Sequence, residues 1–389
     1  MMPLERKKAM RKKASWVKDC FKRFAARGTF RPSGPAASRE ENLAVYRRAR
    51  LKNEGACPNR PLHLLVEVTS KCNLSCKMCN VHYDTKSGIT IPDALLEGTF
   101  ELARSAKTVS PFGLGEPLLH PRIVEIVGKY KSMGLSVGFT TNGMLLSEKI
   151  SRGLIINGLD QLAISIDAAE PVLFSEIRRG ADLKRISENI MALNRLKRSL
   201  QSKSPALALS VVAQASNLHQ LPQIIQLADK WDIRFLTYVP VTAHKHISEI
   251  QHEALGPLFP RGKEIIERCH RDAEMRGIKI DTQRVDYVLN GSDWEEVYGE
   301  TTPCPEPFRF MVIRANGDIF PCCNWDLNKP VAKISVSGEL SVTDLENAWH
   351  DAQWEALRGR IVLRDYPEAC KTCMANFTRP FRDEDLEED

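Results

Sequence analysis

Short apolar runs alternate with amphipathic segments between residues 62 and 241, and this alternation restricts the fold more than any other feature. The runs with the length and composition of strands are LHLLVEVT, TVSPFGLG, LSVGFTT, QLAISIDA, ALALSVVAQ and IRFLTYVPV. Strands that alternate with helices form βαβ units, in which each crossover returns the chain to the same edge of a parallel sheet. We therefore predict an α/β fold, a partial (β/α)6 TIM-like barrel, with the functional site at the carboxyl ends of the strands.

The barrel is predicted over residues 38–292 and opens with a short helix, for which Ser38 and Glu41 form a capping-box pattern. A smaller domain follows over residues 293–381, where FRFMVIRANGDIFPCC indicates a hairpin turning at Asn316-Gly317. VTDLENAWHDAQWEALRGR, within the same domain, indicates one amphipathic helix. Residues 382–389 form an acidic tail.

Residues 1–37 form a basic amphipathic arm and linker. Residues 1–30 hold ten Lys and Arg against Glu5 and Asp19, an excess of +8, so the rest of the chain carries −2 of the total +6. Because the positive charge belongs to one arm, we expect no nucleic-acid partner. The arm suits an anionic membrane surface or an acidic protein, and a solvated extension explains it equally well.

The cysteines indicate metal or redox chemistry. No apolar run approaches the length of about 18 residues that spans a bilayer, and the N-terminus does not have the pattern of a secretory signal. Eleven cysteines in such a chain indicate reduced thiols and a cytoplasmic protein. Three of them, Cys72, Cys76 and Cys79, lie in one loop directly after the first predicted strand.

With three protein ligands, one iron of a [4Fe–4S] cluster stays open to another molecule. Structural zinc requires four ligands, and His82 is the only nearby histidine that could supply the fourth. CxxxCxxC after the first strand of a six-fold βα repeat resembles the radical S-adenosylmethionine (SAM) superfamily, and the resemblance covers residues 61–242. It implies that the amino and carboxylate groups of SAM bind the open iron.

Other motifs resemble the same family. GLGEP is similar to its GGE motif, although Leu114 separates the two glycines. The resemblance implies that the GLGEP turn holds the ammonium group of SAM, through Gly113, Gly115, Glu116 and Pro117. Met78 stands where the family often has an aromatic residue, beside the adenine.

Further residues resemble SAM contacts. SIDA places Ser165 and Asp167 at alternate positions of the fourth strand, so both side chains point the same way, and the resemblance implies contacts to the ribose or the carboxylate. Arg178 resembles the arginine that pairs with the carboxylate; Arg179 is its rival, and either could be a solvated helix charge. Asn142 in TTNG either forms a turn or contacts SAM.

A second set of cysteines follows the pattern C-x12-G-x4-C … CxxC, with Gly317 at its centre. Its thiols are Cys304, Cys322, Cys370 and Cys373. Four cysteines with a distant CxxC also suit structural zinc. The arrangement resembles the twitch domain, the shortened SPASM domain of radical SAM proteins, which implies one auxiliary [4Fe–4S] cluster. Cys323 is the rival of Cys322.

The resemblance implies that SAM is cleaved to a 5′-deoxyadenosyl radical, which removes a hydrogen atom from the substrate. An electron donor of the flavodoxin or ferredoxin type is implied as well. If the substrate radical loses a proton and gives an electron to the auxiliary cluster, the net reaction is a two-electron oxidation. We predict an oxidoreductase that acts on a small polar biosynthetic substrate of the sugar or aminocyclitol type.

Two alternatives stay open. The enzyme could modify a peptide, a protein or a lipid, although residues 1–60 are too short and too basic to resemble a leader-peptide domain. The chain could also be a non-catalytic iron–sulfur or zinc protein with a redox or scaffold role. Glu67 and Tyr238 are candidate proton acceptors, but residues at such positions more often pack or lie in the shell around SAM, and the sequence identifies no catalytic acid or base.

Overall fold

The computed structural model describes residues 38–52, 55, 57–82, 88–242, 247–258, 260–290, 303–337 and 340–371. The predictions for the arm (1–37), for the acidic tail (382–389) and for Cys373 therefore lie outside the described residues. Within this part of the chain, every helix is too short or too polar to cross a membrane.

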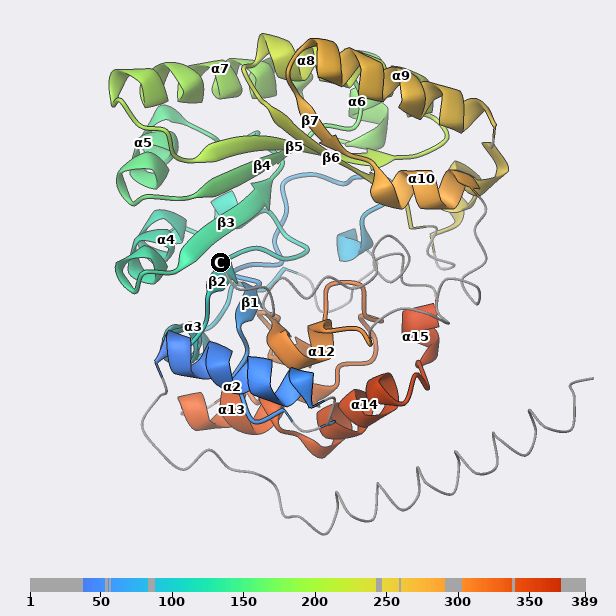
Figure 1. The fold of residues 1–389 in the computed structure, drawn as a ribbon. Coiled ribbons are helices and arrows are strands. Elements are labelled where there is room, and N and C mark those ends of the chain that lie inside the picture. Colours follow the sequence, from blue (N-terminus) through green and yellow to red (C-terminus); the bar gives the residue numbers. More distant parts are fainter. Residues whose placement is uncertain are drawn as a thin grey trace, which may run out of the picture.

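One sheet runs through the molecule, in the order β10-β9-β8-β1-β2-β3-β4-β5-β6-β7 (Figure 1). Neighbours from β1 to β7 are parallel, and β8 is parallel to β1, whereas β9 and β10 are antiparallel to their neighbours. The strands are β1 (His63–Val66), β2 (Thr108–Ser110), β3 (Ser136–Thr141), β4 (Gln161–Ser165), β5 (Ala206–Ala213), β6 (Phe235–Pro240), β7 (Lys279–Asp281), β8 (Phe310–Ile313), β9 (Asp318–Phe320) and β10 (Ala332–Lys333).

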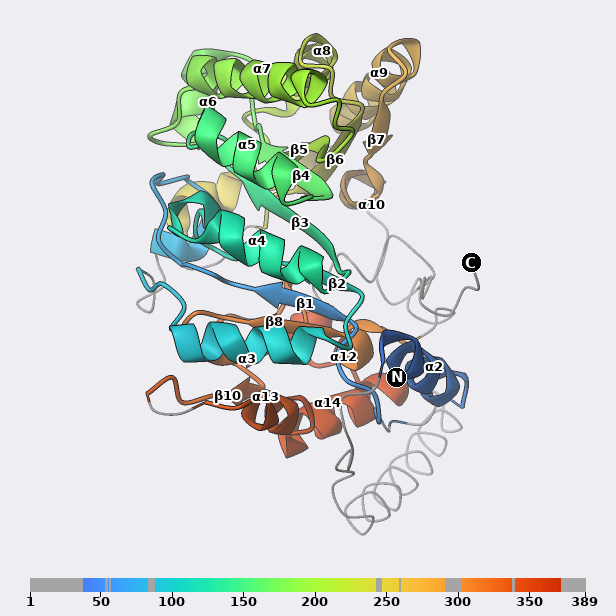
Figure 2. The ribbon, with the colours of Figure 1, turned by 90° about the vertical axis from the view of Figure 1, so that its left-hand side faces the viewer.

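Helices cover the outer side of the curved sheet, as the side view in Figure 2 shows. The helices before and within the barrel are α2 (Arg39–Leu51), α3 (Asp93–Ala103), α4 (Ile123–Ser132), α5 (Glu148–Ile156), α6 (Pro171–Ile177), α7 (Leu183–Ser199), α8 (Leu221–Lys230), α9 (Arg261–Met275) and α10 (Gln283–Asn290). Those of the C-terminal part are α12 (Glu306–Arg309), α13 (Val342–Trp349), α14 (Ala352–Val362) and α15 (Glu368–Lys371). Short 3-10 turns are η1 (Asn80–His82), η2 (Pro117–Leu119), η3 (Leu218–Gln220), η4 (Ser248–Glu253) and η5 (Gly256–Leu258).

Side chains of two sizes alternate along the central strands. In β5, Leu207, Leu209 and Val211 are buried under the helices, whereas Ala208 and Ser210 between them are partly exposed. Large aliphatic side chains gain most from burial beneath the helices, and small ones on the opposite face leave room inside the half-barrel. The predicted α/β partial barrel with its parallel sheet is confirmed.

The hairpin predicted at Asn316-Gly317 is present between β8 and β9. Gly317 has φ +83°, and a Cβ atom there would be 2.9 Å from the Val336 side chain, so glycine is required at the turn. Because β8 pairs with β1, the hairpin extends the barrel sheet, and its turn lies at the edge where β1 ends.

The structure corrects two expectations about secondary structure. The segment predicted as one helix over residues 342–360 is two helices, α13 and α14, because the Asp351 carboxylate accepts a hydrogen bond from the backbone N–H of Gln353 and starts a new helix. Strand β7 was not predicted. It has only three residues and pairs with β6 at the end of the sheet.

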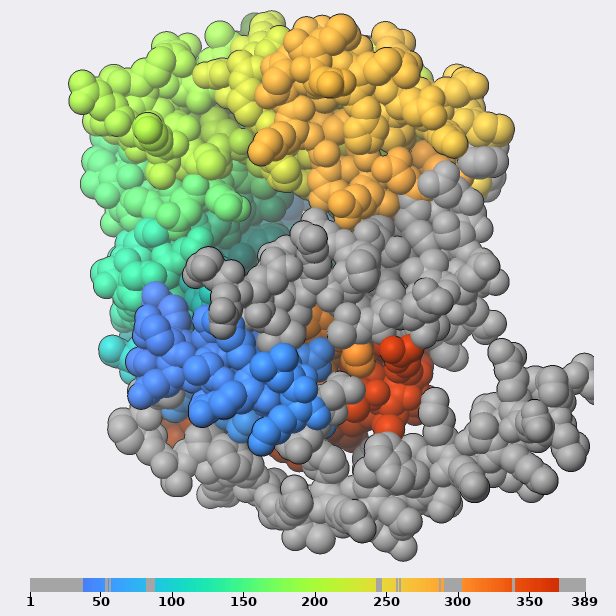
Figure 3. Space-filling view, in the orientation of Figure 1, coloured from blue at the N-terminus to red at the C-terminus, as the bar shows by residue number. Residues whose placement is uncertain are grey.

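The C-terminal helices are attached to the segment that leads into β1. The indole N–H of Trp349 donates to the Asn59 carbonyl at 2.7 Å, and Arg60 forms an ion pair with Glu346. Arg50 of α2 donates to the Pro303 carbonyl at 3.1 Å. In Figure 3 the blue surface of α2 lies near the orange and red surface of the C-terminal part. These contacts lie toward the amino end of β1, away from its carboxyl end.

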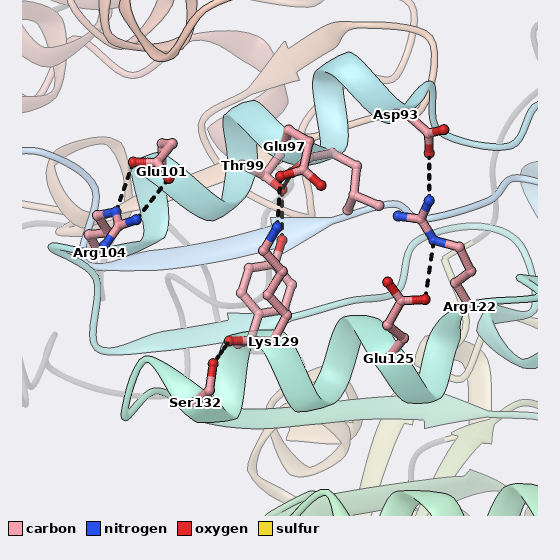
Figure 4. Close-up of polar contacts among 11 residues, drawn as sticks. Asp93, Glu97, Thr99, Glu101, Arg104, Arg122, Glu125, Lys129 and Ser132 are labelled. Carbon is pink, nitrogen blue, oxygen red and sulfur yellow. Dashed lines mark hydrogen bonds and ion pairs between the residues drawn. The ribbon is translucent and has the colours of Figure 1, made fainter.

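On the outer side of the barrel, α3 and α4 are joined by exposed ion pairs (Figure 4). Lys129 Nζ lies 2.7 Å from Glu97 Oε2, and Arg122 Nη1 lies 3.0 Å from Asp93 Oδ1. Such surface pairs contribute little to stability. Because α3 and α4 are among the helices that cover the outer face of the sheet, these charges do not face the interior of the half-barrel.

Candidate active site

The loop of Cys72, Cys76 and Cys79 leaves the carboxyl end of β1 and is held by the segment after α6. The backbone N–H of Ser75 donates to the Arg179 carbonyl at 2.9 Å, and that of Lys77 donates to the Ile177 carbonyl at 2.9 Å. These two bonds flank Cys76 on one side and Arg178 on the other. The cysteine loop and Arg178 are thus fixed opposite each other.

Burial raises the pKa of all three thiols, in the case of Cys76 to about 12, while the positive charge of Arg178 acts in the opposite direction. Cys76 is electrostatically coupled to both Cys72 and Cys79, so the thiols lie near one another. Among the described residues, no three His, Cys, Asp or Glu converge closely enough to hold one metal ion.

Arg178 is 9% exposed and forms an ion pair with Asp167, with 2.7 Å between Nε and Oδ2. Asp167 also accepts a hydrogen bond from the Val212 backbone N–H at 2.8 Å, on Oδ1. The Asp167 carboxylate thus positions Arg178 and the end of β5. The rival Arg179 is half-exposed and pairs with Glu249 instead, at 2.5 Å.

The GLGEP turn packs directly against the start of the cysteine loop. The Glu116 backbone N–H donates to the Lys71 carbonyl at 2.8 Å. A Cβ atom on Gly115 would lie 2.6 Å from that same carbonyl oxygen and would also collide with the Thr69 carbonyl. Glycine is required at this position because two backbones meet there.

The Glu116 carboxylate is 2% exposed and accepts three hydrogen bonds. Its donors are the Thr141 hydroxyl at 2.6 Å, the Asn142 backbone N–H at 2.7 Å and the Leu118 backbone N–H at 3.1 Å. Burial raises the pKa of this carboxyl, against the effect of these bonds. Pro117 follows as the first residue of the buried turn η2. Glu116 therefore ties the GLGEP turn to the end of β3.

Asn142 forms the turn that the sequence allowed as the alternative to a SAM contact, and its amide also contacts the cysteine loop. Its side-chain oxygen accepts from the Met144 N–H at 3.0 Å, which forms a turn, and its amide donates to Asn73 in the cysteine loop at 2.9 Å. Ser165 is the last residue of β4 and pairs in register with Ser210 of β5. Met78 packs against the buried cluster of Val241, Ile247 and Ile250.

The two candidate proton acceptors occupy different places. The Tyr238 hydroxyl donates to the Leu221 carbonyl at 3.0 Å, and burial raises its pKa well above 10. It points to α8 on the helix-covered side, away from the interior of the half-barrel. Glu67 lies at the end of β1 and is 2% exposed, and its carboxylate lies 3.3 Å from Arg314 Nε.

The second set of cysteines lies near the amino end of β8. Cys304 is buried just before α12, Cys322 is partly buried after β9, and Cys370 lies in α15. Tyr366 is electrostatically coupled to both Cys304 and Cys370, and burial raises its pKa to about 12. These two cysteines, far apart in the sequence, therefore flank one side chain. Cys323 is exposed.

Comparison with known families agrees with both cysteine groups. A model described as the radical SAM superfamily matches residues 66–204, and a SPASM model described as an iron–sulfur cluster-binding domain matches residues 304–374. The chain belongs to the radical SAM superfamily. The predicted resemblance is confirmed, including its C-terminal SPASM-type domain.

The radical SAM relatives of this chain are distant, with identities between 22% and 28% over the aligned residues. The chain is 25% identical to a tungsten-containing aldehyde ferredoxin oxidoreductase cofactor-modifying protein of Pyrococcus furiosus, over 67% of this chain and 70% of the relative. It is 22% identical to the PqqA peptide cyclase of Gluconobacter oxydans, over 81% and 83% of the two chains.

Solved structures share the fold. Streptococcus suis SuiB bound to S-adenosylmethionine has a TM-score of 0.58 and 16% identity, over 77% of this chain and 68% of that one. Native anSMEcpe with bound AdoMet has a TM-score of 0.55 and 17% identity, over 85% and 92% of the two chains.

A radical SAM enzyme with a SPASM-type domain uses a SAM-binding [4Fe–4S] cluster, SAM and an auxiliary cluster. The donor sets in this structure fit those groups. Three coupled thiols lie beside a buried arginine at the carboxyl end of β1, and Cys304 and Cys370 flank Tyr366 in the C-terminal domain.

Proposed function

We propose that this enzyme binds a [4Fe–4S] cluster at Cys72, Cys76 and Cys79, binds SAM beside it, and abstracts a hydrogen atom from a small polar substrate. One observation carries the proposal: the cysteine loop, the GLGEP turn and Arg178 are joined at one edge of the barrel. When bound, the cluster supplies the electron that cleaves SAM to methionine and the 5′-deoxyadenosyl radical.

The side chains of this site suit the polar end of SAM. Glu116 has accepted three hydrogen bonds, and because a carboxylate has about four lone-pair sites, one acceptor site is left for the ammonium group. Arg178 uses Nε for Asp167, so its Nη donors are the ones that a carboxylate would take. Asp167 acts through Arg178 rather than on SAM itself. Gly113, Gly115 and Pro117 shape the turn, Asn142 donates to its Glu116, and Ser165 lies at the carboxyl end of β4.

The inner face of the barrel supports a polar substrate. Ser165, Ser210 and Thr237 are register partners on three adjacent strands. Neighbouring positions such as Leu236 and Tyr238 are buried on the opposite, helix-covered face. Because successive side chains of a strand point to opposite faces, the three hydroxyl groups form a row on the inner face. Hydroxyl groups can both donate to and accept from a sugar or an aminocyclitol.

The second part of the proposal concerns the electron. Cys304, Cys322, Cys370 and Cys373 would hold one auxiliary cluster, and four protein ligands would leave it no open iron. The abstracted hydrogen atom goes to 5′-deoxyadenosine. An auxiliary cluster held by these cysteines would supply an electron acceptor, so a substrate radical that lost a proton to solvent and an electron would have undergone a net two-electron oxidation.

Modification of a peptide is the second candidate. The chain matches a PqqA peptide cyclase over 83% of that protein's length. It also resembles SuiB bound to its precursor peptide, with a TM-score of 0.60 over 88% of this chain. The match to a cofactor-modifying protein supports a non-peptide substrate instead.

The source of the hydrogen atom that is transferred to 5′-deoxyadenosine distinguishes these candidates. The reconstituted enzyme, SAM and dithionite are incubated with a deuterated extract of the producing organism, separated into small molecules and peptides. We expect deuterium in 5′-deoxyadenosine with the small-molecule fraction. Deuterium with the peptide fraction alone would contradict the proposed substrate class, and no 5′-deoxyadenosine at all would contradict radical SAM catalysis. In the double variant with Ser210→Ala and Thr237→Val, the substrate should stimulate the formation of 5′-deoxyadenosine less than in the wild type. SAM binding should be unchanged.

A further inference from the structure

Glu67 connects three parts of the chain that are far apart in sequence. It directly follows β1, and its side chain is 2% exposed. One carboxylate oxygen faces the GLGEP turn, and the other faces the hairpin of the C-terminal domain. A buried carboxylate in this position is stable only if its partners satisfy it.

On the barrel side, the Leu114 backbone N–H donates to Glu67 Oε2 at 3.0 Å. Gly113 packs against the stem of the same side chain, and a Cβ atom there would lie 2.6 Å from Glu67 Cγ. These contacts hold the turn that carries Gly115 and Glu116 against the Glu67 side chain.

On the C-terminal side, Glu67 Oε1 lies 3.3 Å from Arg314 Nε and accepts from the Ala315 backbone N–H at 3.3 Å. Arg314 is 2% exposed. The backbones are also joined, since the Glu67 N–H donates to the Ile313 carbonyl at 2.8 Å. Arg314 and Ala315 begin the turn of the hairpin whose second strand leads to Cys322.

We infer that Glu67 is a positioning residue through which the hairpin of the auxiliary-cluster domain holds the SAM-binding turn in place. The inference rests on the proposed function of the GLGEP turn. Because the same Glu67 carboxylate contacts both segments, a displacement of the hairpin at Arg314 also displaces the hydrogen bond to the Leu114 backbone N–H. SAM affinity therefore depends on a contact that the C-terminal domain makes with Glu67, outside the GLGEP turn.

The test uses Glu67→Gln, which keeps the shape but removes the charge, and Arg314→Met, which acts from the other domain. The matched control is Glu346→Gln, because the Arg60–Glu346 pair also joins the C-terminal domain to the barrel, at the opposite end of β1. Two quantities are measured on anaerobically reconstituted full-length protein: hydrogen exchange of peptides covering 111–118, and the dissociation constant of SAM by equilibrium dialysis.

We expect exchange over 111–118 at least fivefold faster and SAM binding about tenfold weaker in both test variants, with iron content unchanged. The double variant should be no worse than the single ones, since both remove the same interaction, and Glu346→Gln should match the wild type. Unchanged exchange and SAM affinity in Arg314→Met would overturn the inference, even if Glu67→Gln failed to fold. If the wild type did not bind SAM, the proposed function would fail, and exchange alone would decide whether Glu67 positions the turn.

Discussion

Replacing Gly115 by alanine tests the contact between the SAM-binding turn and the cysteine loop. The added methyl group would lie 2.6 Å from the Lys71 carbonyl oxygen and 2.6 Å from the Ser70 carbonyl carbon. Both are backbone atoms, so no rotamer change can relieve the collision. Reaching even 3.0 Å requires the two segments to separate by at least 0.4 Å, which disturbs the 2.8 Å hydrogen bond between Glu116 and Lys71.

Overpacking of this kind costs about 1–3 kcal/mol. If this cost falls on the state that binds SAM, the dissociation constant rises by roughly 5- to 150-fold, since 1.4 kcal/mol corresponds to a factor of ten. We expect weaker SAM binding in equilibrium dialysis and a lower iron content after reconstitution, because the displaced residues directly precede Cys72.

Gly256→Ala is the matched control. It makes the same chemical change in a short turn where a Cβ atom would have no neighbour within 4 Å, so SAM binding and iron content should stay at wild-type values. Equal behaviour of the Gly115 and Gly256 variants in both assays would refute the argument that the turn and the loop are packed too closely for any side chain.

Three further predictions concern single side chains. Burial, and to a smaller extent the charges of Arg358 and Arg60, lowers the pKa of His350 to about 4 in the folded protein. Because this pKa lies below the ordinary value of 6.5, the unfolded state binds the proton first. The stabilisation of the folded protein that is present above pH 6.5 is therefore lost as the pH falls toward 4. His350→Gln should therefore remove about 2–3 kcal/mol of that acid-induced loss in urea unfolding, and an identical pH dependence in both proteins would contradict this. Arg178→Met should shift iodoacetamide alkylation of Cys72, Cys76 and Cys79 in the cluster-free protein to higher pH, since the arginine lowers the pKa of each thiol; an unchanged pH dependence would show that Arg178 does not act on them. Tyr238→Phe should cost about 1 kcal/mol by leaving the Leu221 carbonyl without its partner, with 5′-deoxyadenosine formation unchanged, and a large loss of that product would restore Tyr238 as a proton acceptor.

Local patterns were enough to predict most of the fold. The strands β1 to β6 and the helices between them, except the seven-residue α6, follow from apolar runs and helical spacing, and the hairpin follows from Asn316-Gly317. The sequence did not predict β7, since three residues at the end of a sheet are too few for a periodic pattern. The break between α13 and α14 was missed because Asp351 can either continue a helix as a polar residue or cap a new one.

The site was predictable in its residues but not in their connections. CxxxCxxC, GLGEP and SIDA are local motifs, so a single stretch of sequence contains each one. The ion pair of Arg178 with Asp167 spans the short helix α6 between them, and the three-way contact of Glu67 joins residues that the fold brings together from distant segments. No periodicity or spacing predicts such long-range partners, and the sequence therefore placed Glu67 and Tyr238 as equal candidates.

The central claim is that Cys72, Cys76 and Cys79 hold a cluster of their own, separate from that of the C-terminal domain. Iron is counted per chain after anaerobic reconstitution of the wild type, of the variant with all three cysteines replaced by alanine, and of Cys269→Ala, which removes a buried thiol in α9. The account predicts about eight iron ions in the wild type and in Cys269→Ala, and about four in the triple variant. An undiminished iron content in the triple variant would contradict it.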